Sequence, residues 1–569
     1  MKIQRSEYPR PQFARDEWIS LNGEWQFDFG EMDVKSLSLS KVINVPFSYQ
    51  WQASGINDKS VHDTVWYRRT FTLNKNSKRA LLCFNAADYE TDVWINGYRV
   101  ISHVGGFTPF KTDITDYVTD SENEIIVRCK DTLDTAVPRG KQSWTGEPFS
   151  CFYHPNTGIW GSVWIEFFGE DCIDSYSLNS DIDKRTVYGH IESMYAKADE
   201  AEITLKFKDK VLKKQRLSLD GKRTEFNISF ADNAFDFDRL LWSTDTPNLI
   251  YVDFKLLKEA KAADVARARI GLRKISIEHG KICLNNRPLF QRLVLDQGYW
   301  DESGLTPPSA EALKKDIMLS KAMGFNGARK HQKLEDPYYY YYADELGFLV
   351  WAEMPSAYTF CDKEVSAITQ QWQEIVNVAK NFTSVIAYVP LNESWGAREI
   401  KTDKQQQSFA KSLYYLTKSL DNTRLISTND GFETVEASDV LGIHDYDVKQ
   451  ADEFPTKYNN GYDGLYPQGW SLFVDGHKYK GQPAMLTEFG GIALVAEQKD
   501  EAWGYGNGAN DADDLCSRLS QLITGISQTE FQGYCYTQLT DVQQEVNGLL
   551  RSDRASKADL NTLKKIFEN

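Results

Sequence analysis

The first part of the chain consists of short stretches in which apolar and polar residues alternate, many of them β-branched or aromatic. Alternation with a period of two is typical of strands that have one buried face. An Asn-Gly pair at residues 96–97 adds the signal of a tight hairpin turn. Up to about residue 170 the pattern therefore predicts an all-β sandwich, with candidate strands at 25–29, 65–73, 80–86, 91–97, 124–130 and 161–168.

A second β-rich stretch follows from about residue 173 to 272. Its clearest candidate strands are 201–208, 224–230 and 251–257. A length of about 100 residues is that of an immunoglobulin-like sandwich. We therefore expect a second, separate β-sandwich in this part of the chain.

After residue 272 short apolar strands alternate with longer helical stretches. Ser309 can cap a helix that carries Leu313 and Ile317 on one face and stops at Gly324. The tyrosine run 338–342 also has helical spacing and is expected to pack on the strands. Strands alternating with helices over about 300 residues predict a (β/α)8 barrel. The eight candidate strands are 289–296, 325–330, 348–353, 386–392, 424–428, 440–444, 484–488 and 533–538.

Two glutamates stand at the ends of such strands, Glu393 after strand four and Glu488 at the end of strand seven. Barrel enzymes place their chemistry at the carboxyl ends of the strands, and strands four and seven face each other across the mouth. Hydrolysis of a sugar acetal needs two carboxylates, one to protonate the leaving oxygen and one to attack the sugar carbon. The long loops 449–482 and 490–514 belong on the same face.

Composition excludes several classes of partner. The net charge of −16 argues against nucleic acid or an anionic membrane, and no apolar stretch reaches the roughly 18 residues of a membrane span. The N-terminal segment has no apolar signal-peptide core. Eight scattered cysteines without a Cys-x-x-Cys pair predict reduced thiols rather than disulfides or a zinc site. We expect a cytoplasmic protein that needs no metal or cofactor.

Motifs along nearly the whole chain resemble those of the family 2 glycoside hydrolases, which include β-galactosidases, β-glucuronidases and β-mannosidases. The resemblance implies an N-terminal jelly-roll domain (1–172), an immunoglobulin-like domain (173–272) and a catalytic (β/α)8 TIM barrel (273–569). The motifs begin at Pro9, Trp94, Thr157, Leu241, Gly271, Gly324, Leu391 and Thr487, and they read PRPQFARDEWISLNGEWQF, WINGYRVISHVGGFTPFKTDIT, TGIWGSVWIE, LWSTDTPNLIY, GLRKISIEHGKICLNNRP, GFNGARKHQKLEDPYYYYYADELGFLVWAEMP, LNESWG and TEFGG.

The resemblance also implies roles for individual residues. Glu393 matches the general acid/base, Glu488 the nucleophile of a covalent intermediate, and Asn392 the residue that hydrogen-bonds the sugar 2-hydroxyl. The family acts with retention, which implies carboxyl groups about 5–5.5 Å apart. The acid then needs a raised pKa, whereas the nucleophile must stay ionised.

Further residues are candidates for substrate binding or for support of the carboxylates. Arg329 is the natural cation to keep the nucleophile ionised, the alternative being a structural ion pair. Trp395 is expected to help exclude water, and His331 either contacts the sugar or supports a group that does. Glu353 is a supporting carboxylate or a purely structural one.

The end of strand six carries His444 and Tyr446, for which hydroxyl bonding or support of the nucleophile is favoured over a metal site. Tyr536 on strand eight stands where an aromatic platform would lie, the alternative being a barrel-core tyrosine. Asp296, after strand one, is a further candidate for contact with the sugar.

Three departures from the family pattern bear on the sugar. Phe152 stands where galactosidases and glucuronidases carry an acidic residue, and Asp296-Gln297 replaces an Arg-His pair of galactosidases. The Asn-x-Lys element with which glucuronidases hold the substrate carboxylate is missing, and only Arg551 and Arg554 offer cations near that place.

We therefore expect a retaining exo-β-glycosidase that acts on terminal β-galactosides. The alternatives are a β-glucuronidase or another β-glycosidase of the family (galacturonide, arabinopyranoside or mannoside), a transglycosylase, and a non-catalytic carbohydrate-binding protein. The expected partner is a small carbohydrate or glycoconjugate, and a homo-oligomer is plausible by resemblance.

Overall fold

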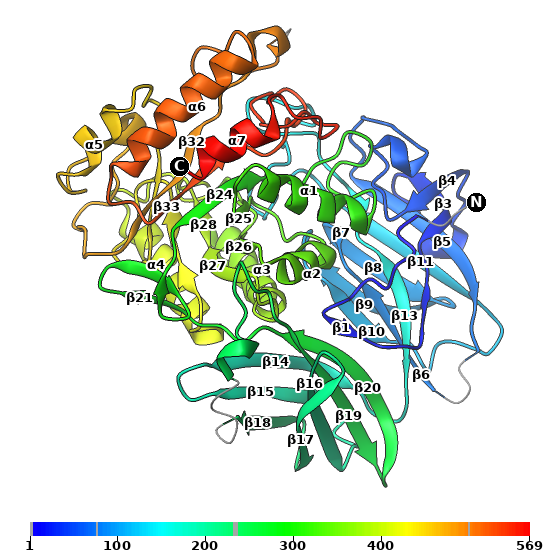
Figure 1. Cartoon of the computed structure of the whole chain (residues 1–569). Helices are drawn as coiled ribbons and strands as arrows, with labels where there is room; N and C mark the ends of the chain where they lie inside the picture. The colour runs from blue at the N-terminus through cyan, green and yellow to red at the C-terminus, as the bar shows by residue number, and fades with distance from the viewer. Residues whose placement is uncertain (1–3, 75–77, 231–236, 499–500) are drawn as a thin grey trace.

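The computed structural model describes residues 4–74, 78–230, 237–498 and 501–569, and it contains two β-sandwiches and a barrel (Figure 1). The first sandwich pairs a six-stranded and a four-stranded antiparallel sheet. Their inward side chains, among them Trp25, Phe27 and Tyr67, form one core. The strands are, in sheet order, β4 (Lys41–Val45), β3 (Gly23–Phe29), β5 (Thr64–Thr72), β11 (Glu122–Lys130), β8 (Glu90–Ile95) and β9 (Tyr98–Val104), then β10 (Phe110–Asp113), β6 (Arg79–Phe84), β13 (Val163–Phe168) and β2 (Trp18–Ser20).

The second sandwich lies below the first in Figure 1 and has a core of its own, around Ile203, Val252 and Phe254. Its sheets have five and three strands. The fold therefore contains the two sandwiches that the alternation predicts. The strands are β1 (Phe13–Ala14), β20 (Lys261–Ile270), β19 (Ile250–Lys258), β16 (Glu200–Phe207) and β17 (Lys210–Ser218), then β14 (Ile173–Asp181), β15 (Thr186–Ser193) and β18 (Arg223–Ser229).

The short strand β1 comes early in the chain but pairs with β20 of the second sandwich. Its Phe13 ring stacks on Tyr176 at 4.5 Å and belongs to the second core. The division of the chain at residues 172 and 272 remains our proposal, and β1 crosses the first of these boundaries. The N-terminal segment thereby ties the two sandwiches together.

The third part is a barrel of eight parallel strands, which confirms the predicted (β/α)8 fold. Strand four breaks at Pro390, which has no N–H to donate to the ladder. The strands are β24 (Gln291–Asp296), β25 (Gly327–Lys330), β26 (Leu349–Glu353), β27 (Val385–Val389) with β28 (Leu391–Asn392), β29 (Leu425–Ile426) with β30 (Asn429–Asp430), β31 (Leu441–His444), β32 (Ala484–Gly490) and β33 (Gly533–Thr537).

Helices surround this barrel, but residues 427–440 contain none, so strand five runs into strand six through a loop. Ser309 accepts from the Ala312 N–H as the predicted cap of α1. The tyrosine run lies in α2, which confirms its helical assignment. None of the described helices is long and apolar enough to cross a membrane. The helices are α1 (Ala310–Ala322), α2 (Pro337–Leu346), α3 (Asp362–Ala379), α4 (Lys404–Leu420), α5 (Glu453–Tyr458), α6 (Ala512–Ser527) and α7 (Leu560–Phe567).

A small sheet closes the amino-terminal end of the barrel. Ile282 and Leu284 pack against the inward residues Leu293 and Trp351 in one apolar cluster. That end is therefore filled, and the chemistry is left to the opposite end. The sheet is β21 (Ile275–Glu278), β22 (Lys281–Leu284) and β23 (Arg287–Pro288); the remaining short elements are β7 (Ala87–Asp88), β12 (Gly158–Ile159), η1 (Val34–Ser36), η2 (Gln52–Ser54), η4 (Phe237–Leu240), η5 (Pro467–Gly469) and η6 (Val495–Glu497).

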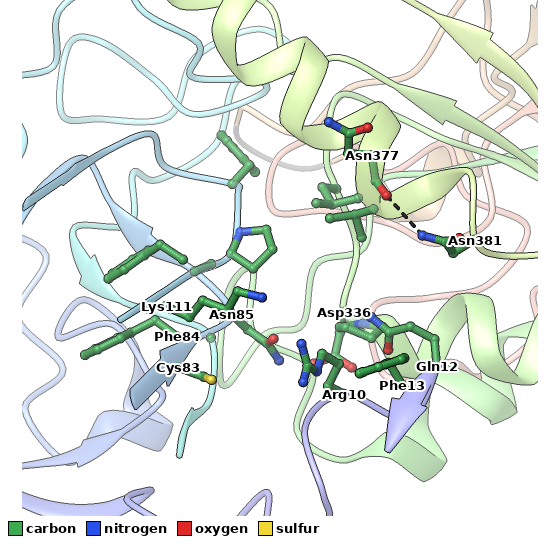
Figure 2. A pocket seen from close by; sticks show the side chains of 18 of the residues that line it. Arg10, Gln12, Phe13, Cys83, Phe84, Asn85, Lys111, Asp336, Asn377 and Asn381 are labelled. Carbon is green, nitrogen blue, oxygen red and sulfur yellow. Dashed lines mark hydrogen bonds between the residues drawn. The ribbon is translucent and has the colours of Figure 1, made fainter. Parts of the chain in front are cut away.

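A cavity of about 220 Å³ lies where both sandwiches meet the barrel (Figure 2). Phe13, Phe84 and Lys111 from the sandwiches line it, together with Asn377 and Asn381 near the end of α3. None of the predicted catalytic or sugar-binding residues lines this cavity. It is therefore separate from the candidate site described next.

Candidate active site

The inward positions of the barrel strands bring the predicted site together at the open end. On β26, Leu349 and Trp351 belong to the interior cluster, so Glu353 two residues further on also points inward. Arg329 on β25 points the same way and reaches four other strand ends. Alternation along each strand therefore selects which polar residue faces the mouth.

Glu393 and Glu488 come from opposite sides of the barrel, as predicted. Carboxylate oxygens of the two residues and a ring nitrogen of His444 all lie within 4.8 Å of one another. Glu393 has a left-handed φ of +50°, which turns the chain sharply after β28. The ladders on both sides of β32 shift register near Glu488, and such irregularities re-aim side chains. Local backbone irregularity therefore directs both carboxylates into one space.

Arg329 is the central cation of this space and is fully buried. Its guanidinium donates to Glu488 Oε1 at 2.9 Å, to Glu353 Oε2 at 2.6 Å and to Asn392 Oδ1 at 2.6 Å. It also lies 3.0 Å from the Asp430 carboxylate. A planar fork of this kind fixes several acceptors at once. Arg329 thus holds the candidate nucleophile, the candidate 2-hydroxyl ligand and two further carboxylates in one arrangement.

His444 connects the two candidate catalytic carboxylates. Nδ1 lies 2.7 Å from Glu393 Oε1, and Nε2 lies 3.0 Å from Asp430 Oδ2 and 3.4 Å from Glu488 Oε1. Burial alone would lower the pKa of His444, but Glu488, Asp430 and Glu393 together raise it to about 10. The ring is therefore an imidazolium that donates from both nitrogens.

The same contact determines the protonation of Glu393. Burial would raise the pKa of Glu393, but the hydrogen bond and charge of His444, with a contribution from Lys141, bring it well below its usual range. We expected a raised pKa for a general acid, and in this substrate-free structure the direction is opposite. The physical reason is the imidazolium 2.7 Å away, which no motif of the sequence indicates.

Tyr446 contacts Glu488 from the other side. Its hydroxyl group lies 2.7 Å from Glu488 Oε2, to which it donates, and 2.9 Å from the Thr537 hydroxyl. Its ring stacks on Tyr505, with centroids 3.6 Å apart. Tyr505 belongs to the long loop after strand seven, so this part of the loop lies on the predicted face; residues 499–500 of that loop lie outside the described residues.

Two residues that sequence reasoning missed complete the charged cluster. Asp430 contacts both Arg329 and His444, and it is reached through the short strand β30 that pairs with β28. Thr537 bonds Tyr446 from the end of β33. Asp430 lies two residues beyond the end of predicted strand five, at residue 428. A search of the strand ends finds Asp430 only if β30 is recognised as the continuation of strand five.

His331 and Glu353 lie beside the cluster rather than between its carboxylates. His331 Nδ1 is 2.9 Å from Glu353 Oε1. Burial, with the charges of Lys141 and Arg329, lowers the pKa of His331 well below its usual value, so its ring is neutral. Burial raises the pKa of Glu353 to about 7, against the opposing charge of Arg329. Both side chains are buried, which is consistent with a supporting position.

Trp395 forms one wall of the site with aromatic residues of other segments. Its ring meets Phe152 edge-on at 5.5 Å and Tyr358 at 5.3 Å between centroids. Phe152 comes from the first sandwich, so its loop reaches the barrel mouth. Arg398 lies 4.5 Å above the Trp395 ring on the solvent side.

Asp296 and Tyr536 are not brought to the site. Both follow the outward positions of their strands: Asp296 pairs with Lys330 at 3.0 Å, and the Tyr536 ring packs against Phe489 and Phe567. Their neighbours Leu295 and Cys535 are the residues that face the interior. Successive residues of a strand point to opposite faces, so an error of one residue exchanges the inward and outward sets. A continuous apolar run does not show which set points inward.

Arg551 and Arg554, the cations considered for a substrate carboxylate, are engaged elsewhere. Arg551 pairs with Glu497 and Arg554 with the buried Asp316 of α1. The cation that does reach the site is Lys141, whose charge acts on both Glu393 and His331. It comes from the first sandwich and is 8% exposed.

Glu393, His444 and Glu488 also form the kind of group that can hold a metal ion. The raised pKa of His444 means that both ring nitrogens carry hydrogen, so a metal ion would have to displace a proton to bind there. Arg329 already supplies a positive charge to Glu488 at 2.9 Å. The hydrogen bonds and ion pairs between these groups form an arrangement that is suited to proton transfer.

Comparison with known families gives two matches. Residues 18–145 match the model for the sugar binding domain of glycosyl hydrolases family 2, and residues 275–569 match the model for the family's TIM barrel domain. The second match alone covers more than half of the chain. The chain belongs to glycosyl hydrolases family 2. The resemblance seen in the motifs is thereby confirmed.

Curated family 2 relatives carry different activities in their names. The chain is 24% identical over 518 residues to a putative beta-glucuronidase of Formosa agariphila, a match over 87% of this chain and 59% of the relative. It is 24% identical to a beta-galactosidase of Thermoanaerobacter pseudethanolicus, over 72% of this chain and 54% of the relative. The chain thus spans little more than half the length of these relatives.

Solved structures of family 2 share the fold of the whole chain. A beta-D-glucuronidase of Dictyoglomus thermophilum superposes with a TM-score of 0.79 at 19% identity, covering 99% of this chain and 98% of the other. A beta-galacturonidase of Eisenbergiella tayi superposes with a TM-score of 0.77 at 18% identity, covering 99% and 98%. At this level of identity the likeness establishes the fold alone.

Proposed function

We propose that this chain is a retaining β-glycosidase that hydrolyses terminal β-linked sugars by double displacement. The observation that carries the proposal is the meeting of Glu393 and Glu488, with carboxylate oxygens within 4.8 Å of each other. Retaining glycosidases hold their carboxyl groups about 5–5.5 Å apart, whereas inverting ones leave about 6.5–9.5 Å for a water molecule.

In the first step Glu488 attacks the anomeric carbon and forms an ester bond to the sugar. The bond to the leaving oxygen breaks, and Glu393 supplies the proton that this oxygen takes up. Arg329 and Tyr446 fix the two oxygens of Glu488, so its attacking lone pair is oriented before substrate binds. Asn392, held by Arg329, is placed to meet the sugar 2-hydroxyl.

The proton for Glu393 belongs to the pair that it forms with His444. The pair shares one proton across 2.7 Å, and the microstate with the proton on Glu393 is the one that protonates the leaving group. In the second step ionised Glu393 takes a proton from water, whose oxygen attacks the anomeric carbon and releases Glu488. The ionised Glu393 of this structure is the form that the second step needs.

The identity of the sugar that the enzyme cleaves is a separate question from the mechanism. The β-galactoside prediction rests on the missing Asn-x-Lys element, which made a uronic substrate less favoured. The named relatives include both beta-galactosidases and beta-glucuronidases. The buried Lys141 removes the main argument against a uronic substrate, because it supplies a cation from another part of the chain. A β-uronide is therefore the second candidate.

Azide rescue tests the two assigned roles against each other. Glu393→Ala should regain activity on nitrophenyl glycosides with azide and give the β-glycosyl azide, because azide then attacks the enzyme ester. Glu488→Ala should give the α-glycosyl azide, because azide attacks the free glycoside directly. The same anomer from both variants would contradict the assignment.

The rivals predict other results. A non-catalytic carbohydrate-binding protein would bind sugars and hydrolyse none of a panel of nitrophenyl galactoside, glucuronide, galacturonide, mannoside, glucoside and arabinopyranoside. A transglycosylase would transfer the sugar to added acceptor sugars in preference to water. Product analysis with and without acceptors separates these outcomes.

A further inference from the structure

Lys141 is a buried cation at the edge of the active site that the proposed mechanism does not use. It is 8% exposed, and its ammonium group forms no ion pair with any carboxylate in the described part of the chain. Its contacts are the Cys151 thiol and the face of Phe152, 5.5 Å from Nζ to the ring centroid. Lysine is seldom buried without a charged partner, because losing water costs the ammonium several kcal/mol.

Glu545, one of the carboxylates whose charge acts on Lys141, is engaged by other groups. Glu545 accepts from the Tyr153 hydroxyl at 2.6 Å through Oε2 and from Asn547 at 3.0 Å through Oε1. Phe152 brings an apolar ring to the position where the family pattern predicts an acidic residue. The ammonium group therefore keeps hydrogen-bonding capacity that a thiol and an aromatic face do not satisfy.

The backbone around Lys141 is fixed to the barrel mouth, so its position is set in advance. Its carbonyl accepts from the Tyr153 N–H at 2.8 Å, and the preceding Arg139 and Gly140 N–H groups both donate to the Ser356 carbonyl. Ser356 lies in the loop after β26, which bears Glu353. A segment of the first sandwich is thus docked on the barrel with Lys141 facing the site.

The charge of Lys141 reaches both candidate catalytic carboxylates. Burial would lower the pKa of Lys141, but Cys151, Glu545, Glu488 and Glu393 together raise it, so the ammonium stays charged. It also lowers the pKa of His331. A permanent positive charge therefore borders the space where the sugar would lie.

We propose that Lys141 binds the carboxylate of a uronic sugar, and that this chain thereby selects β-linked uronides over neutral glycosides. The inference rests on the proposed function and names its substrate class. The carboxylate would supply the missing anion, and a charge-assisted hydrogen bond in a water-poor site is stronger than one between neutral groups. A neutral sugar would leave the buried ammonium without an ionic partner.

The competing interpretation is that Lys141 only balances the negative charge of Glu393 and Glu488. In that case its loss would impair every substrate alike and would shift the pH profile for all of them. Uronide recognition instead changes the ratio between charged and neutral substrates. The ratio is therefore the quantity to measure.

The experiment compares wild type, Lys141→Met, Lys141→Arg and Lys111→Met on nitrophenyl β-D-glucuronide, β-D-galacturonide, β-D-galactoside and β-D-glucoside. Lys111 is the matched control, because it is a lysine of the same sandwich that pairs with Asp174 at 2.9 Å and lines the separate cavity of Figure 2. In Lys141→Met the uronide-to-neutral ratio of kcat/KM should fall about tenfold to a hundredfold. Lys141→Arg should keep part of the ratio, and Lys111→Met all of it.

Calorimetry with free D-glucuronate, D-galacturonate, D-glucose and D-galactose adds a readout that needs no turnover. Wild type should bind a uronate more tightly than its neutral counterpart, and Lys141→Met should lose this difference. Hydrolysis of neutral glycosides but not of uronides, or an equal loss on all substrates in Lys141→Met, would overturn the inference and leave the proposed function standing. Uronate binding that depends on Lys141, without hydrolysis of any glycoside, would support the inference about Lys141 and contradict the proposed function.

Discussion

At the scale of single residues, the site is a small set of charges whose protonation states depend on one another. Arg329 and His444 are the cations in direct contact with the carboxylates Glu393, Glu488 and Asp430. Because all of these groups except the partly exposed Glu393 are buried, removing one leaves its partner without compensation. Substitutions here should change the protonation and orientation of the remaining groups more than they change the fold.

Tyr446→Phe tests the hydroxyl contact with Glu488. The variant loses a 2.7 Å hydrogen bond to Glu488, the proposed nucleophile, while keeping the ring stacked on Tyr505. A hydrogen bond to a charged group contributes about 1.5–3 kcal/mol, so kcat/KM should fall about tenfold to a hundredfold with little change in Tm. Steady-state kinetics beside thermal unfolding check this. A large drop in Tm with unchanged kcat/KM would show a structural role instead.

His444→Gln tests the shared proton. In wild type the pair of His444 and Glu393 keeps its last proton up to the raised pKa of about 10 of the imidazole. In the variant Glu393 alone must hold that proton, and its carboxyl loses it at lower pH. The alkaline limb of the kcat/KM profile should therefore move to lower pH. An alkaline limb at the wild-type position would rule out the pair as the proton donor.

At the scale of elements, the sequence predicts much of what the structure contains. Every predicted barrel strand has a counterpart, because buried parallel strands are continuous apolar runs bounded by turns and caps. Which residues of a strand point into the barrel is harder to predict from an apolar run. Arg329 and Glu353 are predicted to face the site and do so. Asp296 and Tyr536 are also predicted there, but they face the helices. Pairings between distant segments, such as β1 with β20 or β28 with β30, leave no local signal.

Arg15 joins the two sandwiches in addition to β1, since it bonds Glu166 of β13 and Asp264 of β20. All three side chains are buried. Arg15→Met leaves the buried Asp264 without its cation and Glu166 with Arg10 alone, and it should lower the free energy of unfolding at neutral pH by about 3–5 kcal/mol. Denaturant unfolding measures this. A decrease of less than about 1 kcal/mol in the free energy of unfolding would show that these ion pairs stabilise the fold no more than surface salt bridges do.

The ion pair between Arg15 and Glu166 also predicts how the stability depends on pH. Burial would raise the pKa of Glu166, but Arg10 and Arg15 lower it to about 2 from an ordinary 4.5. A depressed carboxyl pKa stabilises the fold above the ordinary value and loses that contribution as the pH falls towards 2. The stability difference between wild type and Arg15→Met should therefore narrow between pH 7 and pH 3. A constant difference would exclude this linkage.

At the scale of the whole molecule, the active site is not a property of the barrel alone. The segment 139–154 of the first sandwich carries Lys141 and Phe152 to the mouth, and Tyr153 bonds Glu545 across the junction. The sequence predicts the candidate catalytic carboxylates in the barrel but not the position of Lys141, because nothing local to Lys141 indicates which domain it will face. In the proposal that Lys141 binds the sugar carboxylate, the sandwich sets the specificity and the barrel supplies the chemistry.

Gly140→Ala tests this docking. Gly140 has a left-handed φ of +60°, and an added Cβ would lie 2.5 Å from the Gln332 carbonyl oxygen of the barrel. The segment must shift, so kcat/KM should fall at least about tenfold while both sandwiches stay folded. Gly97→Ala is the matched control, with φ of +84° and no atom within 4 Å of the new Cβ. Steady-state kinetics and circular dichroism compare the two variants. Equal kcat/KM values in both would show that the docked segment does not contribute to the site.

The central claim is that Glu393 and Glu488 act together in a double displacement, because their carboxylate oxygens lie within 4.8 Å. The most direct test is proton NMR of the sugar first released from a nitrophenyl β-glycoside that the enzyme cleaves, recorded before mutarotation. The account predicts the β-anomer as the first product. First appearance of the α-anomer would mean a single displacement by water and would contradict the account.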